Sequence, residues 1–239
     1  MALLEGRKIS KSFGGVQALS EVDFKVDAGS IVGLIGPNGA GKTTLFNTVA
    51  GAFKPTSGQI TFNGVDITGL PATTVCRMGL ARTFQVSRPF GAMSCLENVM
   101  VAAINRRPGG SRAEVERLAR EKLHLVGIPE LEGVEARHLN VIQKKRLELA
   151  RALATEPRLL LLDEVMGGLN TQEINQAVVF IRNLRDELGL TVLWIEHVMG
   201  AVMQAAERII VLDQGRVLMT GVPQDVVTDE RVIQAYLGE

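Results

Sequence analysis

A glycine-rich loop between an apolar run and a helix-like run carries the residues most directly suited to chemistry. It follows Ile31–Ile35, precedes Leu45–Ala50 and matches the pattern G-x-x-x-x-G-K-[ST]. Its residues are Gly36, Pro37, Asn38, Gly39, Ala40, Gly41, Lys42, Thr43 and Thr44. Glycines let successive backbone N–H groups converge on phosphate oxygens, and the positive end of the following helix faces the same point. The pattern predicts that Lys42 reaches the β- and γ-phosphates of a nucleotide and that Thr43 ligates Mg²⁺. The alternative, a turn that only caps a helix, is disfavoured by the strand-like run before it.

Acidic and imidazole side chains follow two later apolar runs. Asp163 and Glu164 end the run that begins at Leu159, and His197 comes soon after the run Leu190–Ile195. Ligands of open α/β sheets bind beyond the carboxyl ends of the strands, so both acids are expected to face the loop. Asp163 suits Mg²⁺, directly or through water, and Glu164 suits a general base that activates water. At this edge His197 is a candidate γ-phosphate contact. Two solvated acids at a strand end remain the alternative.

Short strands separated by turns are predicted around the loop in the N-terminal third. Ile9–Phe13 and Val22–Val26 flank the Gly14-Gly15 break, and Gln59–Gly64 is a later strand entering a turn. We therefore expect antiparallel β-structure attached to the nucleotide-binding strand. Phe13 could stack on a nucleotide base, but taken alone its pattern favours a core position.

The rest of the chain predicts a helical segment followed by a βαβ rhythm. Pro71–Met78 is expected as a helix and Gly79–Phe84 as a strand ending at Gln85. The second half predicts strands at 159–162, 190–195, 208–212 and 216–220, with helices at 171–188 and 198–206 and a short helical tail. Such uninterrupted apolar strands are typical of a parallel sheet buried on both faces.

No strand pattern is found between residues 90 and 153. Ser111 to Glu114 forms a predicted capping box, and a second helix is expected from about Gln143 to Ala154. We interpret residues 90–154 as a helical lobe inserted into one α/β domain whose core is 1–89 and 155–239.

Composition limits the class of protein. Lys plus Arg and Asp plus Glu number 26 each among 239 residues, so no net field argues for nucleic acid as a partner. Cys76 and Cys95 lack metal or redox spacing and are expected to be reduced and structural. No signal-peptide core and no run of about 20 apolar residues is present, which predicts a cytoplasmic protein. The apolar fraction of 46% also hints at a surface covered by partners.

Together these residues resemble the nucleotide-binding subunits of ATP-binding cassette (ABC) transporters over nearly the whole chain. The loop matches the family's Walker A motif, Gln85 its Q-loop glutamine, Leu159–Glu164 its Walker B strand with the catalytic glutamate, and His197 its switch histidine. Phe13 stands where the family places its adenine-stacking aromatic. The resemblance implies a P-loop NTPase with a RecA-like core that binds ATP and Mg²⁺. It also implies a dimer in which each ATP lies between one subunit's Walker A loop and the other's signature motif.

The resemblance further implies the roles and partners of the site. Thr43, Gln85 and Asp163 would hold Mg²⁺, Glu164 would activate water, and His197 would steady the γ-phosphate. Implied partners are membrane-spanning permease subunits, a second ABC ATPase in a homodimer or heterodimer, and a solute-binding protein, with no nucleic acid. The expected location is peripheral, on the inner face of the cell membrane.

More narrowly, the chain is similar to ATPase subunits of branched-chain amino-acid importers; related subunits serve amides, urea and lipopolysaccharide export. The stretches that carry this similarity are Thr83-Phe84-Gln85, Glu97-Asn98-Val99, Gly168-Leu169-Asn170, Ile195-Glu196-His197 and Ala235-Tyr236-Leu237-Gly238-Glu239. After Gln85, residues 86–93 include Arg88, Phe90 and Met93, types enriched at interfaces. In ABC transporters this region meets the coupling helix of the membrane subunit.

Two segments depart from the family pattern. The signature Leu-Ser-Gly-Gly-Gln is replaced by residues 139–143, in which Asn140 and Gln143 are the candidate contacts to the opposing γ-phosphate. Val165 replaces the proline after the catalytic glutamate, and residues 167–170 replace the loop that follows. Two alternatives therefore stay open: an ATP-binding regulatory or degenerate subunit of a heterodimer, and a non-transport ABC ATPase.

Overall fold

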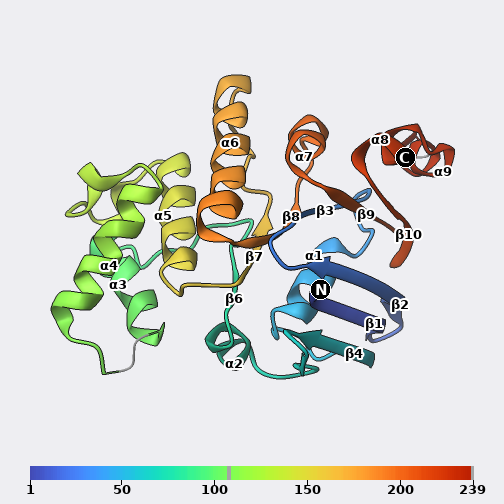
Figure 1. Ribbon diagram of the computed structural model, residues 1–239, viewed down its shortest axis with the longest axis horizontal. Helices are drawn as coiled ribbons and strands as arrows, with labels where there is room; N and C mark the ends of the chain where they lie inside the picture. The colour runs from blue at the N-terminus through green and yellow to red at the C-terminus, as the bar shows by residue number, and fades with distance from the viewer. Residues whose placement is uncertain (107–108, 238–239) are drawn as a thin grey trace.

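The computed structural model describes residues 1–106 and 109–237, which form two sheets with helices between, above and beside them (Figure 1). Gly238 and Glu239, the end of the C-terminal similarity, lie outside the described residues. Of the helices described, none is long and apolar enough to cross a membrane.

The larger sheet has the order β10-β9-β3-β8-β7-β6 and is parallel except for β10. Its strands are β3 (Ile31–Ile35), β6 (Leu80–Arg82), β7 (Leu159–Asp163), β8 (Thr191–Ile195), β9 (Arg208–Asp213) and β10 (Arg216–Gly221). All residues of β3, β7 and β8 are buried, as their continuous apolar sequences predict. The carboxyl ends of these strands therefore reach one edge of the sheet.

The smaller sheet is antiparallel, as predicted, with the order β2-β1-β4-β5. Its strands are β1 (Ala2–Phe13), β2 (Val16–Asp27), β4 (Ser57–Phe62) and β5 (Val65–Asp66). The first two are longer than expected from sequence. Register shifts between them and positive φ angles at Lys8 and Glu21 interrupt the alternation on which strand prediction depends.

Helices cover both faces of the larger sheet and form a group at one end of the molecule (Figure 1). Their bounds are α1 (Lys42–Val49), α2 (Ala72–Arg77), α3 (Cys95–Arg106), α4 (Arg112–Leu125), α5 (Val141–Leu153), α6 (Thr171–Leu188), α7 (Met199–Ala205), α8 (Pro223–Thr228) and α9 (Glu230–Leu237), with 3₁₀ turns at Pro129–Leu131 and Ala136–His138. α1 lies between the two sheets, α6 and α7 lie above the larger one, and α3, α4 and α5 stand side by side.

Two hydrophobic clusters lie on opposite faces of the parallel sheet. Along β7, Leu159 and Leu161 pack with α1 and the antiparallel sheet, whereas Leu160 and Leu162 pack with α6 and the α3–α5 group. Because β7 takes part in both clusters, its carboxyl end is fixed from two sides.

Helix starts depend on capping that was only partly visible in the sequence. The predicted box at Ser111 forms with Glu114. α5, however, begins at Val141 rather than near Gln143, because Asn140 and Gln143 form a second box. The predicted strand at 79–84 is also shorter, since β6 ends at Arg82 and leaves Gln85 beyond the sheet.

The cysteines are free thiols: Cys95 is buried and Cys76 is half-buried. Burial raises the pKa of both thiols, which disfavours the reactive thiolate.

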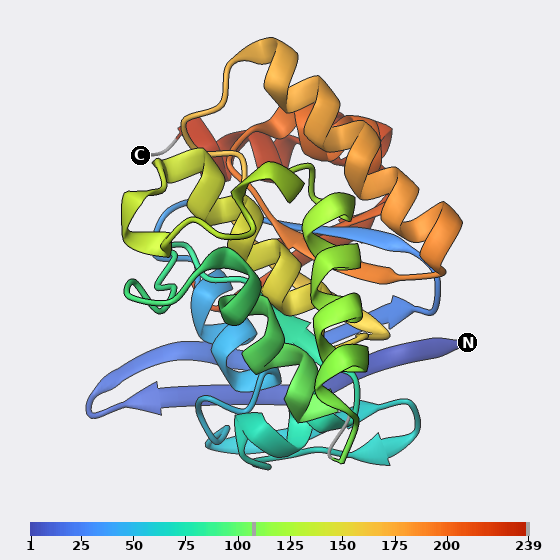
Figure 2. The same ribbon diagram turned by 90° about the vertical axis from the view of Figure 1, so that its left-hand side faces the viewer.

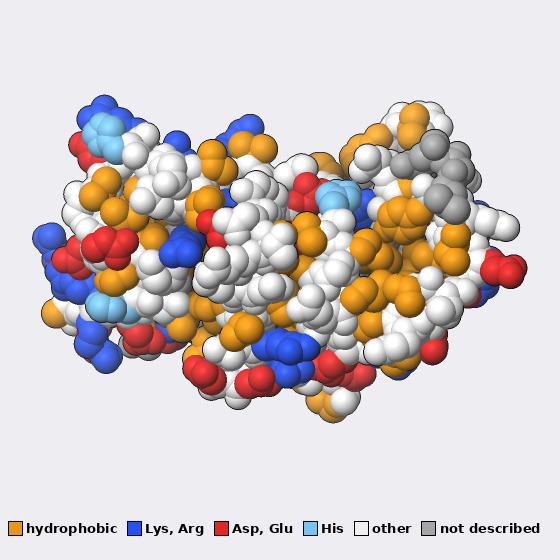
Figure 3. All heavy atoms as spheres, turned by 90° about the horizontal axis from the view of Figure 1, so that it is seen from above, with side chains coloured by type: hydrophobic (Ala, Val, Ile, Leu, Met, Phe, Trp, Pro, Cys, Tyr) orange, Lys and Arg blue, Asp and Glu red, His pale blue; other side chains and the backbone are white. Residues whose placement is uncertain are grey.

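Exposed apolar side chains near the C-terminus include Val222, Val227 and Ile233. Seen from above, hydrophobic side chains gather on the end of the molecule that carries α8 and α9 (Figure 3).

Candidate functional site

The glycine-rich loop joins the buried strand β3 to helix α1. Gly36 and Gly41 adopt φ angles of 149° and 100°, and a Cβ would lie 1.9 Å from the Leu212 carbonyl oxygen at the first and 2.6 Å from that of Ala18 at the second. Only glycine fits these two positions. The α1 N-cap has no side-chain hydrogen bond, so backbone N–H groups at the helix start are available to an anion.

Lys42 turns back toward the loop that precedes it. Its buried Nζ donates to the carbonyl oxygens of Gly36 at 2.6 Å and Pro37 at 2.8 Å. These bonds hold a cation against the loop, beside the helix start. The local geometry therefore combines a positive charge with backbone donors, as phosphate binding requires.

Three predicted magnesium residues line one cavity of about 650 Å³, which Thr43, Gln85 and Asp163 share with Arg82. Asp163 is 2% exposed, and its Oδ2 accepts from Arg82 Nη2 at 2.7 Å. Arg82 Nη1 also donates to Asn47 Oδ1 at 2.5 Å. Arg82 belongs to none of the motifs in the sequence, yet it neutralises the acid expected at the metal site.

Oxygen donors in this cavity fit Mg²⁺. A hydroxyl from Thr43, an amide oxygen from Gln85 and a carboxylate from Asp163 are the hard ligands that Mg²⁺ prefers. No group of three His, Cys, Asp or Glu side chains able to hold a metal ion occurs in residues 1–106 or 109–237. Mg²⁺ is usually coordinated by one or two carboxylates together with water and substrate phosphates, and this set of donors matches that preference.

Glu164 is the meeting point of the predicted catalytic residues. It accepts from Gln85 Nε2 at 2.6 Å through Oε2, and its Oε1 lies 2.6 Å from His197 Nε2. Its φ of 49° is unusual for a residue other than glycine and turns the chain sharply after β7. The structure thus brings Gln85, Glu164 and His197 together from three separate parts of the chain.

A buried acid next to His197 supports this arrangement. Glu196 is 3% exposed and accepts from the backbone N–H of Met166 at 2.8 Å and of His197 at 2.9 Å. It therefore ties the segment after Glu164 to the end of β8. The only sign of this role in the sequence is an acid directly before the histidine.

Known proteins of one family resemble this chain over its whole length. The profile described as ABC transporter matches residues 19–167, and one described as branched-chain amino acid ATP-binding cassette transporter matches 216–239. The high-affinity branched-chain amino acid transport ATP-binding protein BraF of Pseudomonas aeruginosa is 40% identical, over 99% of this chain and 98% of its own. LivG of Escherichia coli, of the same description, is 39% identical over the same shares.

The chain belongs to the ABC transporter family. Solved ABC structures agree: a nucleotide-free ATP-binding cassette superimposes with a TM-score of 0.89 at 29% identity, and the ADP conformation of MJ1267 with 0.88 at 29%, each covering 100% of both chains. The dimeric cassette MJ0796 superimposes with 0.84 at 25% identity, covering 92% of this chain and 98% of its own.

The expected class is thereby confirmed. The chain is an ATP-binding and ATP-hydrolysing subunit of an ABC transporter with the P-loop NTPase fold.

The altered signature segment of this ABC subunit is ordered as a helix start. Asn140 Oδ1 accepts from the Gln143 backbone N–H at 2.9 Å, and Gln143 Oε1 accepts from that of Asn140 at 3.0 Å. Val141 beside them is 67% exposed. Both candidate contacts to an opposing phosphate thus already serve as caps of α5.

Phe13 is not a core residue. Its ring is 43% exposed and meets Phe53 edge-to-face at 5.3 Å, with Lys11 Nζ 4.8 Å above it. The core interpretation is therefore wrong: Phe13 ends β1 where the β1–β2 hairpin extends past the helices (Figure 2). An exposed ring leaves the adenine-stacking role open to this residue.

Proposed function

We propose that this ABC subunit powers import of branched-chain amino acids by hydrolysing ATP with Mg²⁺ at the site around Glu164. The main observation in support of this catalytic site is that Gln85 Nε2 and His197 Nε2 each lie 2.6 Å from an oxygen of the Glu164 carboxylate. The names of BraF and LivG support the solute class, because both are 39% or more identical along nearly their full length.

In the proposed mechanism, Lys42 and the loop N–H groups bind the phosphates, and Phe13 stacks on adenine. Thr43, Gln85 and Asp163 would hold Mg²⁺, which would draw charge from the phosphate oxygens. Glu164 accepts a proton from water as the water oxygen bonds to the γ-phosphorus. The bond to the bridging oxygen breaks, giving ADP and phosphate. His197 donates a hydrogen bond that holds the γ-phosphate while it passes from ADP to water.

The proposed assembly has a second ABC ATPase, two membrane-spanning subunits and a solute-binding protein. The chain would lie in the cytoplasm against the inner face of the membrane. A dimeric cassette of 25% identity supports pairing of two such subunits.

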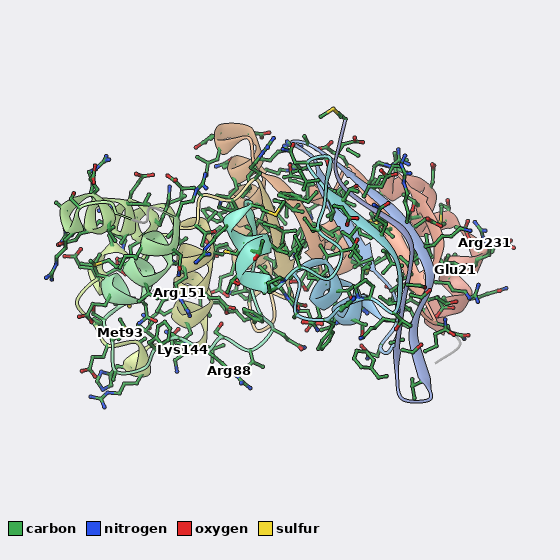
Figure 4. All side chains as sticks on the ribbon, turned by 90° about the horizontal axis from the view of Figure 1, so that it is seen from below. Glu21, Arg88, Met93, Lys144, Arg151 and Arg231 are labelled. Carbon is green, nitrogen blue, oxygen red and sulfur yellow. The ribbon has the colours of Figure 1, made fainter. Side chains whose placement is uncertain are left out.

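The surface proposed to receive the membrane subunit is centred on Phe90. Its ring is 46% exposed and carries the Arg151 guanidinium at 5.0 Å. Buried Asn98 fixes the surrounding turn by donating to the carbonyls of Phe90 and Met93 at 3.0 and 3.2 Å. Figure 4 shows Arg88, Met93 and Arg151 on the same side of the molecule. A pinned turn with an exposed aromatic and cations suits a short helix carrying an acid.

Loss of coupling is expected from Phe90→Ala combined with Met93→Ala. In cells lacking this subunit, plasmid-borne parent should restore uptake of labelled leucine, whereas the double variant should restore about a tenth or less. The purified variant should still bind ATP, since the phosphate loop is untouched. Val179→Ala, which trims another exposed apolar side chain, is the control.

Uptake unchanged by removal of the subunit would contradict the proposed solute. Full uptake with the double variant would place the coupling surface elsewhere, and loss of folding would mean that Phe90 and Met93 are structural. Co-sedimentation with membranes only when the permease is present would support the peripheral location.

A second candidate, a regulatory subunit with little turnover of its own, is favoured because the Asn140 side chain is engaged as the N-cap of α5. Asn140→Ser with Val141→Gly and Ile142→Gly keeps an N-cap and opens backbone N–H groups to an opposing γ-phosphate. We expect roughly tenfold faster ATP hydrolysis by the isolated protein. An unchanged rate would show that Asn140 already makes the contact or that a partner supplies it, and mixing with the partner subunit separates these outcomes.

A further inference from the structure

Helix α5 presents two charged side chains, Lys145 and Glu148, toward different loops of the site. They are three residues apart and therefore share a helix face. Figure 1 shows α5 between the α3–α4 pair and strand β7. Neither side chain was identified from the sequence, and the mechanism above uses neither.

Lys145 binds the segment that follows the Walker B strand. Its Nζ donates to the carbonyl oxygens of Gly167 at 2.7 Å and of Glu164 and Val165 at 3.3 Å each. Burial lowers the pKa of Lys145, while the carboxylates of Glu196, Glu164 and Glu148 oppose the shift. Three carbonyl dipoles converging at one point repel each other, and the ammonium offsets that repulsion. It therefore helps hold Glu164 at its unusual φ of 49°.

Glu148 binds the loop that carries Gln85. It is 8% exposed; its Oε1 accepts from the Phe84 backbone N–H at 2.6 Å, and its Oε2 accepts from the Ser87 hydroxyl. Burial raises the pKa of Glu148, and both hydrogen bonds oppose the shift. One carboxylate thus fixes the loop on each side of Gln85.

The two loops held by α5 meet in the Gln85–Glu164 hydrogen bond of 2.6 Å. The hydrogen bonds therefore form a closed network. Lys145 binds the Glu164 segment, Glu164 binds Gln85, and Glu148 binds the backbone of Phe84 next to Gln85. We therefore expect a change at Lys145 or Glu148 to alter the distance between the Gln85 and Glu164 side chains.

We propose that Lys145 and Glu148 are positioning residues that together set the geometry of Gln85 and Glu164. They act through the loops and touch no reacting atom. Because α5 also begins with the altered signature segment, they connect that segment to the general base of the same subunit. The inference rests on the proposed role of Glu164 as the base.

The test compares the full-length parent with Lys145→Met, Glu148→Gln and the double variant. Lys145→Met keeps the stem and loses three donated bonds, so kcat should fall about tenfold with little change in the KM for ATP. Glu148→Gln keeps one acceptor oxygen and should lower kcat about threefold. The fold-decrease in kcat of the double variant should be smaller than the product of the two single fold-decreases, because both substitutions disrupt the same hydrogen-bond network. Lys144→Met and Glu187→Gln, adjacent or exposed residues of the same charges, are the controls.

Hydrogen exchange gives a readout independent of turnover. Amide exchange over residues 84–89 and 164–168 should speed up in both single variants, while exchange in β3 and the phosphate loop stays unchanged. Ser87→Ala, which removes one bond to Glu148, provides a milder variant if the others do not fold, and it should speed exchange over 84–89.

Parental kcat and parental exchange in Lys145→Met or Glu148→Gln would overturn the inference while leaving the proposed function intact. Loss of ATP binding with unchanged kcat at saturation would overturn it as well. If Glu164→Gln hydrolyses ATP as fast as the parent, the proposed base fails, and the inference fails with it. That result is separate from the first, because it appears in a variant with α5 unaltered.

Discussion

Glu164→Gln is expected to bind ATP as the parent does and to lose hydrolysis by about 10²- to 10³-fold in kcat. The amide cannot accept a proton from water, while Lys42 and the loop lie on other elements. In the parent, Gln85 Nε2 and His197 Nε2 each lie 2.6 Å from an oxygen of Glu164. The substitution replaces one of these oxygens with an N–H₂ group, which faces one of the two nitrogens. Steady-state hydrolysis and equilibrium binding of a fluorescent ATP analogue measure the two effects separately.

Glu187→Gln is the matched control for Glu164→Gln, because it removes an exposed carboxylate from α6. It should hydrolyse ATP at the parental rate. If the Glu164 variant turns over within a few-fold of the parent, Glu164 is not the base, and Asp163 becomes the next carboxylate to test.

Much of this site could be predicted because its chemistry is local in the sequence. The Gly36–Thr44 pattern specifies a loop geometry by itself, and the structure gives Gly36 and Gly41 positions that only glycine fits. The meeting of Glu164 and His197 follows from β7 and β8 being adjacent parallel strands, whose carboxyl ends share an edge.

Other parts of the site depend on contacts that no local pattern encodes. Glu148 binds the backbone N–H of a residue 64 positions away, and Arg82 pairs with Asp163 81 positions away. Backbone donors are identical in every residue, so the sequence cannot show which one Glu148 will bind. A faint signal existed: charged residues on an otherwise apolar helix face need partners when buried.

Wrong expectations had physical causes of the same kind. An aromatic side chain is usually buried, which favours a core position for Phe13, yet the β1–β2 hairpin extends past the helices that would cover it (Figure 2). The sequence predicts a start for α5 near Gln143, whereas the helix begins at Val141 because Asn140 is its N-cap. Sequence patterns describe a single strand or helix. The exposure of a side chain depends on which other elements pack against that strand or helix.

Lys42→Ala, unlike Glu164→Gln, should weaken ATP binding itself. Removing the ammonium takes away the charge-assisted bond to the phosphates, and we expect ATP affinity to fall by about 10- to 100-fold. The Gly36 and Pro37 carbonyl oxygens also lose a donor, since Lys42 Nζ lies 2.6 and 2.8 Å from them. Part of the loss therefore comes from a loosened loop rather than from the missing charge.

Lys42→Arg separates these two contributions to ATP affinity. It keeps the positive charge but lacks the compact ammonium that fits between two carbonyls, so a loop effect weakens both variants and a charge effect weakens only Lys42→Ala. Lys54→Ala, at a lysine outside the loop, is the surface control. Equilibrium binding of ATP gives the affinities, and hydrogen exchange over residues 36–44 reports the loop. Parental affinity in Lys42→Ala would mean that the lysine only shapes the loop, leaving phosphate binding to the backbone N–H groups and the start of α1.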